Sequence, residues 1–340
     1  MAYNYQVVTN NLIKELPQRI KDVIEQRFGL KNKERKTLEE IGEAYDITRE
    51  RVRQIEESGF AKLKPRLKEY QGVLDYFRDQ IKLSGNLKRE DILLQSLGGE
   101  KQQNQVFFLL TLGSNFKKFY QTKDFYSLWT IDENSARSAE DFLKFLEKRF
   151  GELKTPLNSE EIKKEFSSHF GKHLASEALQ SLLEISKKIK AGVDGRYGLK
   201  DWSEINPRGV KDKAFLVLKK QQRPLHFTEV TELINSSDFG KMFGEKALTQ
   251  TVHNELIKDP RFVLVGRGLY ALGEWGYQPG QVKDVILNIL KESNKPLTRD
   301  QILERVLKQR IVKTNTVFLN LNNKKFFLKN QEGKYQVREA

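Results

Sequence analysis

The sequence predicts a mainly α-helical protein with small β wings, in which a helix-turn-helix is followed by four tandem winged-helix domains. Two observations predict this: a pair of short capped helices joined by a tight turn near the N-terminus, and one sequence pattern that recurs four times after it. A length of 340 residues with 38% hydrophobic content is enough for several small cores. We expect a head at residues 1–70 and four repeats, numbered 1 to 4, at 71–133, 134–207, 208–279 and 280–340.

The helix-turn-helix is predicted from the segment "KTLEEIGEAYDITRERVRQIE". Thr37 and Thr48 are good N-caps, because a hydroxyl satisfies a free amide of the first helical turn. Asp46 lies between them and tolerates the left-handed backbone of a tight turn. Upstream, the segment at 10–30 predicts one further amphipathic helix that covers the pair.

The second of these helices has two distinct faces, because successive residues turn by 100°. We expect one stripe to be buried, formed by Val52, Ile55, Gly59 and Leu63. The opposite face carries Arg49, Glu50, Arg53, Gln54 and Glu57. Arginine reads guanine, glutamate the cytosine amine and glutamine adenine, so this face suits base recognition, although a solvated charged face is an equal alternative. A glycine costs a helix about 1 kcal/mol, so Ser58-Gly59 predicts a bend or fraying before the basic tail "AKLKPRLK".

Residues 12–67 resemble region 4 of the bacterial primary sigma factors. The resemblance rests on a "LP-x-R" helix that ends in "RFGL", followed by "TLEEIGE", "TRERVRQIE" and a basic tail. It implies that the helix after Thr48 enters the major groove of a promoter −35 element in double-stranded DNA. It also implies docking on the flap tip of the β subunit of core RNA polymerase. The implied base and phosphate contacts are Thr48, Arg49, Glu50, Arg51, Arg53 and Gln54.

The remaining residues repeat one pattern. Its most similar stretches are "SGNLKREDIL" (84–93), "LKTPLNSEEI" (153–162), "QRPLHFTEV" (222–230) and "NKPLTRDQIL" (294–303). Each follows an amphipathic helix and precedes a second helical stretch and a strand-like ending. The period of about 60 to 70 residues suits a small domain rather than a solenoid unit. This order describes a winged helix, with Asn158, Thr228 and Thr298 as caps or first-turn residues.

Repeat 3 is the most distinctive copy. Through "RPLHFTEVTELI" and "DPRFVLVGRGLYALGEW", residues 208–279 resemble the HARE-type winged helix, which is also the N-terminal module of the RNA polymerase delta subunit. The other three repeats look like divergent copies. The resemblance implies binding to DNA or to polymerase, without separating the two.

The net charge of +14 favours a polyanionic partner. Residues 281–340 hold thirteen Lys or Arg against six Asp or Glu, a net charge of +7, which is half of the excess. In repeat 4 we expect the phenylalanines to point inward. The lysines predicted to contact phosphates there are Lys313, Lys324, Lys325, Lys329 and Lys334.

The sequence offers little for catalysis. There are no cysteines, which excludes disulfides, thiolate metal sites and cysteine nucleophiles. His169 and His173 are close, but Gly171 interrupts their helix, and Trp202 and Trp275 recur as packing residues. We therefore expect no enzyme activity, cofactor or metal. Without a long apolar stretch or a signal peptide, we expect no membrane contact and a cytoplasmic, bacterial, nucleoid-associated protein.

Together these features predict a DNA-binding transcription factor that recognises a promoter −35-like element and associates with RNA polymerase. It is not predicted to be a complete sigma factor, because no segment resembles the parts of that family that melt the −10 element. Two alternatives stay open. One is a delta-like accessory factor that binds polymerase and reads no DNA, and the other is the DNA-targeting subunit of a restriction or defence system.

Overall fold

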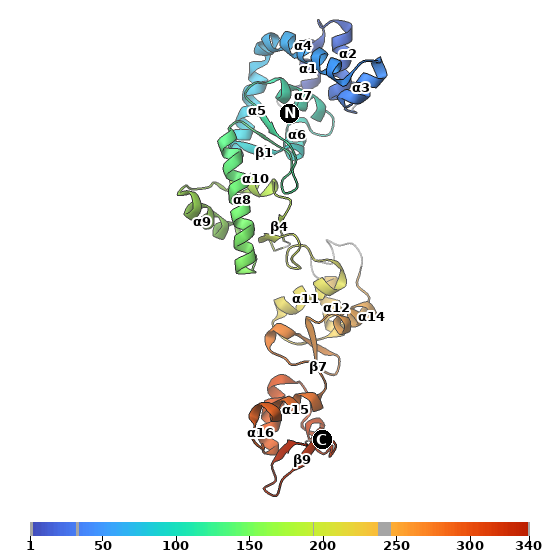
Figure 1. Cartoon of the computed structure of the whole chain (residues 1–340), viewed down its shortest axis with the longest axis vertical. Helices are drawn as coiled ribbons and strands as arrows, with labels where there is room; N and C mark the ends of the chain where they lie inside the picture. Colours follow the sequence, from blue (N-terminus) through green and yellow to red (C-terminus); the bar gives the residue numbers. More distant parts are fainter. Residues whose placement is uncertain (1–2, 32–33, 193, 237–245, 339–340) are drawn as a thin grey trace. The chain divides into compact units, whose positions relative to one another are not determined.

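The computed structural model describes residues 3–31, 34–192, 194–236 and 246–338. It is mainly helical with small antiparallel sheets, so the predicted fold class, mainly α-helical with small β elements, is confirmed. The chain divides into two compact units, an N-terminal unit at 1–200 and a C-terminal unit at 201–340 (Figure 1). The boundaries between the five predicted domains and the winged-helix assignment of each repeat stay predictions.

The head contains four helices: α1 (Tyr5–Ile13), α2 (Gln18–Phe28), α3 (Leu38–Tyr45) and α4 (Arg49–Leu67). The prediction of a single helix over 10–30 is wrong, since α1 ends at Ile13 and Pro17 is the N-cap of α2. A proline disfavours helical geometry at the residue before it, so the chain leaves the helix before Pro17 and starts a new one. A short 3₁₀ turn, η1 (Lys68–Tyr70), follows α4.

The same order of elements then recurs in all four repeats. Repeat 1 contains α5 (Gln71–Leu83), β1 (Leu87–Arg89), α6 (Glu90–Gly98), α7 (Gln103–Leu112), β2 (Lys117–Phe119) and β3 (Leu128–Thr130). Its sheet is antiparallel in the order β1-β3-β2. Repeat 2 contains α8 (Glu133–Leu153), α9 (Ser159–Phe170), α10 (Ser176–Glu184), β4 (Ile189–Ala191) and β5 (Tyr197–Leu199). A bridge between Leu157 and Tyr197 takes the place of its first strand.

The C-terminal unit repeats this order twice more. Repeat 3 contains α11 (Gly209–Gln221), β6 (Leu225–His226), α12 (Phe227–Ser236), α14 (Thr249–Lys258), β7 (Phe262–Gly266), β8 (Leu269–Leu272) and η2 (Gly273–Trp275). Repeat 4 contains α15 (Val282–Ser293), α16 (Arg299–Gln309), α17 (Thr314–Leu321), β9 (Phe327–Lys329) and β10 (Tyr335–Val337). The sheet order is β6-β8-β7 in repeat 3, and β9 pairs with β10 in repeat 4. The predicted recurrence of helix, helix, helix and hairpin is therefore confirmed over the described residues.

The predicted helix starts are confirmed. Thr37, Asn158 and Thr298 are N-caps of α3, α9 and α16, and each is closed by a capping box. Thr228 lies in the first turn of α12. These side chains satisfy amide donors that the first turn of a helix leaves free, so they fix where each helix begins.

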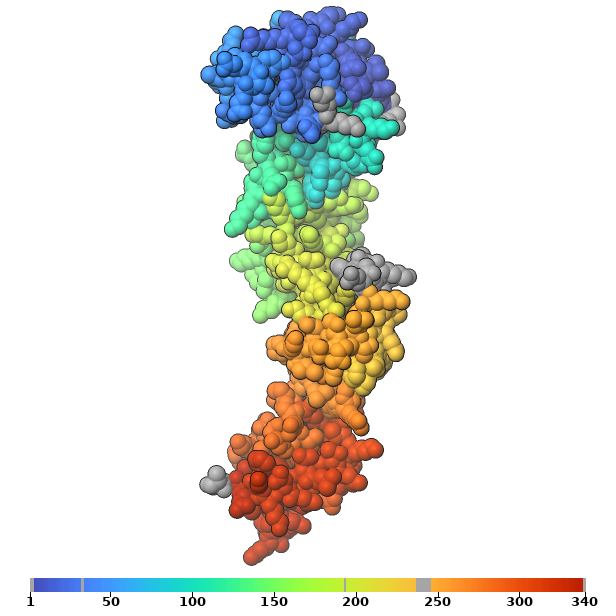
Figure 2. Space-filling view, turned by 90° about the vertical axis from the view of Figure 1, so that its right-hand side faces the viewer, coloured from blue at the N-terminus to red at the C-terminus, as the bar shows by residue number. Residues whose placement is uncertain are grey.

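The head and repeat 1 share one hydrophobic core. The cluster runs from Tyr5 in α1 to Trp129 in β3, and α7 packs against α1, α2 and α4. The Phe28 ring lies 5.1 Å from that of Phe108 and 5.8 Å from that of Phe60, measured between centroids. Figure 2 shows the surfaces of the head (blue) and repeat 1 (cyan to green) meeting without a break. Repeat 1 therefore covers an apolar face of the head helices.

Repeats 3 and 4 are joined by a buried arginine. Arg310 is 3% exposed, and its guanidinium donates to the backbone oxygens of Leu264, Gln278 and Gly280. The amide of the next residue, Ile311, donates to Val265 O at 2.8 Å. Burial lowers the pKa of Arg310. These contacts attach the end of α16 to strand β7 of the preceding repeat.

Candidate nucleic-acid interface

The turn between α3 and α4 is built by local chemistry, as the sequence predicts. Asp46 adopts the left-handed conformation with φ 53°, and the amide of Ile47 donates to Gly42 O at 3.0 Å. A Cβ at Gly42 would lie 2.6 Å from Ile47 O, so only glycine fits there. Thr48 is the N-cap of α4, and its Oγ1 accepts the amide of Arg51 at 3.2 Å. The angle between the two helices is therefore set by residues whose types suit each position.

Helix α4 runs from Arg49 to Leu67, so the basic tail belongs to one continuous helix and the predicted fraying after Ser58 is wrong. A Cβ at Gly59 would lie 2.6 Å from Ile24 Cδ1 and 2.8 Å from Ile20 Cγ2. The missing side chain lets α2 pack closely on α4, and this packing offsets the cost of glycine in a helix, which is about 1 kcal/mol. The predicted buried stripe is confirmed, with Val52, Ile55, Gly59 and Leu63 all buried.

The opposite face of α4 is exposed, but its side chains are largely paired with one another. The guanidinium of Arg53 donates to Glu50 from Nε at 2.9 Å and from Nη2 at 2.7 Å, and its Nη1 also donates to Glu57. Arg51 donates from Nη1 to Gln54 Oε1 at 3.0 Å. Arg49 makes no ion pair or side-chain hydrogen bond with the described residues. The face thus presents the unbonded Arg49 beside one ion-paired group, Arg53 with Glu50 and Glu57, and beside Arg51, whose partner Gln54 is neutral.

The pair between Glu50 and Arg53 keeps the carboxylate ionised. The hydrogen bond from Arg53 is the main cause that lowers the pKa of Glu50 below its ordinary range. An ionised carboxylate is a hydrogen-bond acceptor only, so Glu50 matches the donor amine of cytosine. Because the pair is exposed and screened by water, exchanging it for contacts with DNA costs little.

Two arginines outside the predicted contact residues also shape this region. Arg27, at the end of α2, lies 3.6 Å from Glu56 and donates to Lys36 O at 2.9 Å, so it fastens the segment that leads into α3. With Arg49, it lines a hollow between the starts of α3 and α4. Arg66, in the basic tail, donates to Leu12 O at 3.0 Å and so closes the end of α1. The sequence does not reveal these two roles, because each depends on contacts with another segment of the chain.

The five lysines predicted in repeat 4 differ in their surroundings. Lys313 is the N-cap residue of α17, and Lys324 and Lys325 lie between α17 and β9. Lys329 lies 5.8 Å from the centroid of the Tyr335 ring. Among the described residues these four have no acidic partner, whereas Lys334 bonds to Glu332 at 2.9 Å. Lys334 is therefore the weakest candidate for a phosphate contact. The head residues from Thr48 to Gln54 belong to the other compact unit.

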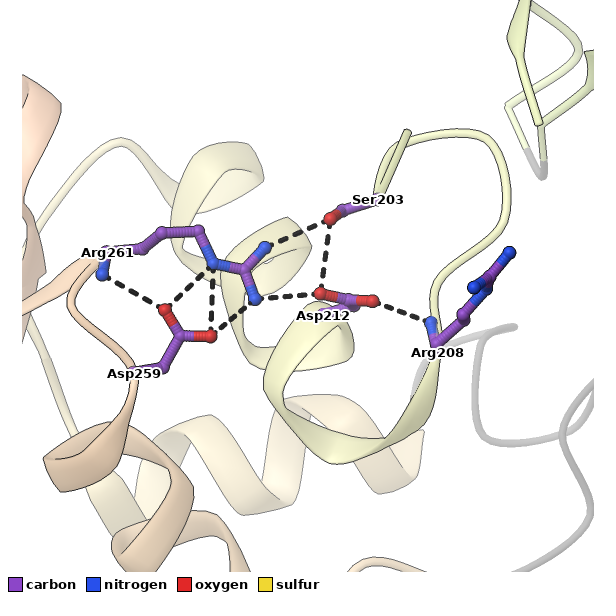
Figure 3. Close-up of polar contacts among 5 residues, drawn as sticks. All are labelled: Ser203, Arg208, Asp212, Asp259 and Arg261. Carbon is purple, nitrogen blue, oxygen red and sulfur yellow. Dashed lines mark hydrogen bonds and ion pairs between the residues drawn. The ribbon is translucent and has the colours of Figure 1, made fainter. Parts of the chain in front are cut away.

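A partly buried polar network in the C-terminal unit is structural (Figure 3). Arg261 donates to Asp259 Oδ2 and to Asp212 Oδ1, both at 2.7 Å, and from Nη1 to Ser203 Oγ at 3.0 Å. The other oxygen of Asp212 accepts the amide of Arg208 at 2.7 Å. The hydrogen bond from Arg261 lowers the pKa of Asp259. Both carboxylates are occupied, so the network ties the segment before α11 to the start of β7 rather than forming a reactive site.

The two neighbouring histidines do not share a helical face. His169 stacks on Phe145 with centroids 4.4 Å apart, while His173 follows Gly171, the left-handed C-cap of α9. Over the part of the chain that the structure describes, no three histidine or acidic side chains gather as metal ligands would. Trp275 packs against the core of repeat 3. The described helices include none that is both long and apolar enough to cross a bilayer.

Comparison with known proteins identifies two segments. Residues 12–65 match the family model for sigma-70 region 4. Residues 208–275 match the model of the HARE-HTH family, whose description names a helix-turn-helix domain of ASXL proteins and restriction endonucleases.

Sigma factors are similar to the N-terminal region of the chain. RNA polymerase sigma factor sigB of Arabidopsis thaliana is 51% identical over 55 residues, which is 16% of this chain and 10% of that protein. SigA of Microcystis aeruginosa is 46% identical over 54 residues, 16% of this chain and 13% of that protein. SigA of Nostoc sp. is 43% identical over 65 residues, 17% of each. The chain thus spans less than a fifth of the length of these relatives. Both resemblances are confirmed: the chain carries a sigma-related, DNA-binding type of helix-turn-helix at its N-terminus and a HARE-type one in repeat 3.

Proposed function

We propose that the protein is a DNA-binding transcription factor that recognises a promoter −35-like element through α4 and associates with core RNA polymerase, without being a complete sigma factor. The observation that carries the proposal is the exposed row on α4, opposite a buried stripe, in a segment similar to sigma-70 region 4. We further propose that the four repeats are winged helices and that the protein acts in the bacterial cytoplasm, on the nucleoid, and not as an enzyme.

In this proposal, the start of α4 lies in the major groove. Arg49 reaches guanine or a phosphate, Glu50 accepts from cytosine, and Gln54 bonds adenine. Thr48 and the free amides of the first turn face a phosphate, which the positive end of the helix dipole favours. Arg53 holds the Glu50 carboxylate in place, since its Nε and Nη2 are both bonded to that residue. Arg51 is held by Gln54 in a similar way and supplies a phosphate contact.

In the same proposal, the lysines of repeat 4 hold the DNA backbone without reading sequence. Lys313, Lys324, Lys325 and Lys329 are exposed and have no acidic partner among the described residues. Each lysine that neutralises a phosphate releases a condensed counterion, which makes the affinity depend on salt. Such contacts position a protein on the duplex and carry no sequence information themselves.

The proposed polymerase contact is the β flap, approached by the head. Two alternatives have an observation in their favour. The paired state of Glu50 and Arg53 leaves the α4 face satisfied without DNA, as a factor that reads no DNA would require. The description of the family that repeat 3 matches names restriction endonucleases, which suits a DNA-targeting subunit of a defence system.

Two measurements test the proposal. The first is binding of the full chain to duplexes selected from a random library, with Arg49→Ala as the variant and Arg137→Ala, another exposed arginine, as its charge-matched control. We expect the head variant to lose preference for the selected sequence and the control to keep it. The second is co-purification with core polymerase, with and without nuclease. Retention after nuclease together with no selected sequence would favour the accessory factor, and loss of polymerase after nuclease would favour the defence subunit.

A further inference from the structure

The third helix of each repeat has a different environment. In repeat 1, every residue of α7 is buried or partly buried, because the helix lies in the core shared with the head. In repeat 2, α10 packs against β1, where Lys88 bonds to Ser181 at 3.2 Å and to Glu184 at 2.7 Å. A Cβ on Gly85 would lie 2.6 Å from Ala178 Cβ, so these elements are in close contact. Repeats 1 and 2 therefore use their third helices for packing within the chain.

Helix α17 of repeat 4 is anchored on one side only. Val317 and Leu321 are buried in the core of the repeat. The guanidinium of Arg299, in α16, lies 3.2 Å from the centroid of the Phe318 ring. These contacts hold α17 in place and turn its other side outward. Repeat 4 is in turn attached to repeat 3 through the buried guanidinium of Arg310.

The free side of α17 is uncharged and suits base edges. Asn315, Thr316 and Leu319 are exposed and lie within about 100° of one another around the helix. Leu319 is 72% exposed, among the most exposed large apolar side chains of the described residues. An asparagine amide pairs with adenine through two hydrogen bonds, and an apolar side chain packs against the methyl group of thymine. The face therefore matches A·T base pairs in the major groove.

The charge around α17 points to DNA as the occupant. From Arg305 to Gln331 the sequence holds seven Lys or Arg and no acidic residue. Lys313 precedes the helix, and Lys324 and Lys325 follow it, so positive charge flanks the uncharged face at both ends. Helix α14 of repeat 3 is also exposed, but it carries Glu255 and is followed by Asp259. Among the third helices of the described residues, α17 alone combines an exposed, uncharged face with a flanking sequence that contains no acidic residue.

We infer that α17 is a second DNA-reading helix, which enters the major groove and recognises A·T base pairs through Asn315 and Leu319, and that α7 and α10 do not contact DNA. This rests on the proposal that the protein binds DNA. It adds to that proposal a second specificity, carried by a repeat that no family match covers.

The test is selection of duplexes from a randomised library by the full chain and three variants of it. The wild-type chain is expected to select two sequence elements, one of them A·T-rich. The α17 variant, Asn315→Ala with Leu319→Ala, should lose the A·T-rich element, with affinity for it falling roughly fivefold or more. The α14 variant, Asn254→Ala with Ile257→Ala, is the matched control, because it removes the same types of exposed side chain from repeat 3, and it should keep that element. The head variant, Arg49→Ala with Gln54→Ala, should lose the other element only.

The outcomes separate the inference from the proposed function. If the head variant changes nothing while the α17 variant loses the A·T-rich element, the proposed head function fails and the inference stands. If the α17 variant keeps the A·T-rich element, or loses affinity equally for every duplex, the inference is overturned. Both substituted residues of α17 are exposed, so an unchanged melting temperature is expected and shows that the variant is folded. A parallel measurement of polymerase binding completes the test, since a loss there without a change on DNA would assign α17 to a protein partner.

Discussion

The head and repeat 4 are both basic, but they carry their charge in opposite ways. On α4, Arg53 is bonded to Glu50 and Glu57, so much of the charge is balanced on the same helix. Around α17, no carboxylate lies between Arg305 and Gln331. Balanced charge contributes little attraction to a polyanion but fixes the orientation of side chains, whereas unbalanced lysines attract any phosphate. Under the proposed function, the paired side chains of α4 supply specificity, and the lysines of repeat 4 supply most of the salt-dependent affinity beside the base contacts of α17.

The largest expected effect comes from removing the unbalanced lysines. Substitution of Lys313, Lys324, Lys325 and Lys329 by alanine removes four predicted phosphate contacts, so the slope of log K against log salt should fall by about 3 to 4. Between low and moderate salt this corresponds to on the order of 100-fold in affinity, equal on all sequences. Lys334→Ala is the control, since Glu332 already balances that charge, and it should change the slope least. Titration of duplex binding over a range of salt measures it, and an unchanged slope in the quadruple variant would assign these lysines to an acidic protein surface.

The second effect concerns the packing of the head. Gly59→Ala places a Cβ 2.6 Å from Ile24 Cδ1, so we expect overpacking to destabilise the N-terminal unit by about 1–3 kcal/mol. Gly151→Ala in α8 is the matched control, because no atom outside its own helical turns would lie within 4 Å of the added Cβ. There the better helix propensity of alanine should stabilise the unit by up to about 1 kcal/mol. Denaturant titration of both variants measures this, and equal stabilisation by the two changes would show that α2 does not press on Gly59.

The third expected effect tests whether Glu50, whose charge is balanced by Arg53, contributes to base specificity. Glu50→Ala should cost about 1–3 kcal/mol of discrimination at one base pair, because the cytosine amine loses its acceptor. It also releases one of the two carboxylates bonded to Arg53, so affinity for random duplex should stay constant or rise. Glu57→Ala releases Arg53 in the same way but lies farther along the helix, and it should keep the base preference. Competition binding with single-base substitutions measures both, and equal losses on specific and random DNA would remove the base-reading role from Glu50.

The smallest expected effect is a difference between two helix caps in how their contribution to stability depends on pH. Backbone and side-chain hydrogen bonds from Thr37 lower the pKa of Glu40 below its ordinary value of 4.5. A depressed pKa means that this contribution to stability is complete above the ordinary pKa and is lost as the pH falls through the lowered one. The capping box of α16 uses Gln301, an amide that does not titrate in this range. Glu40→Gln should therefore reduce the acid sensitivity of the N-terminal unit slightly, and thermal melts between neutral and acidic pH in wild type and variant measure the change.

Local chemistry was readable from the sequence, while contacts between distant segments were not. The caps at Thr37 and Thr48, the turn at Asp46 and the buried stripe of α4 follow from side-chain type and helical period, and all are confirmed. From the sequence, Gly59 is expected to weaken the helix. The isoleucines of α2 that need its small size are 35 and 39 residues away in the chain, so the sequence does not show this contact. Glu50 and Arg53 are three residues apart on one helix, so their ion pair could have been predicted from the spacing alone.

The unequal roles of the repeats could not be predicted for a related reason. The sequence pattern gives each repeat the same order of elements, and it contains no information on which surface meets a neighbouring repeat. The burial of α7 depends on helices α1, α2 and α4 of the head, and that of α10 on β1. The contact residues of the head and of repeat 4 stay predictions until binding is measured.

The core shared by the head and repeat 1 also limits how the head can be reused. A fragment that ends at residue 70 would expose the rings of Phe28 and Phe60, which lie against Phe107 and Phe108 in the intact chain. Exposed aromatic surface of this kind promotes aggregation. In protein engineering, a soluble fragment that contains the head of this chain is therefore expected to need repeat 1 as well.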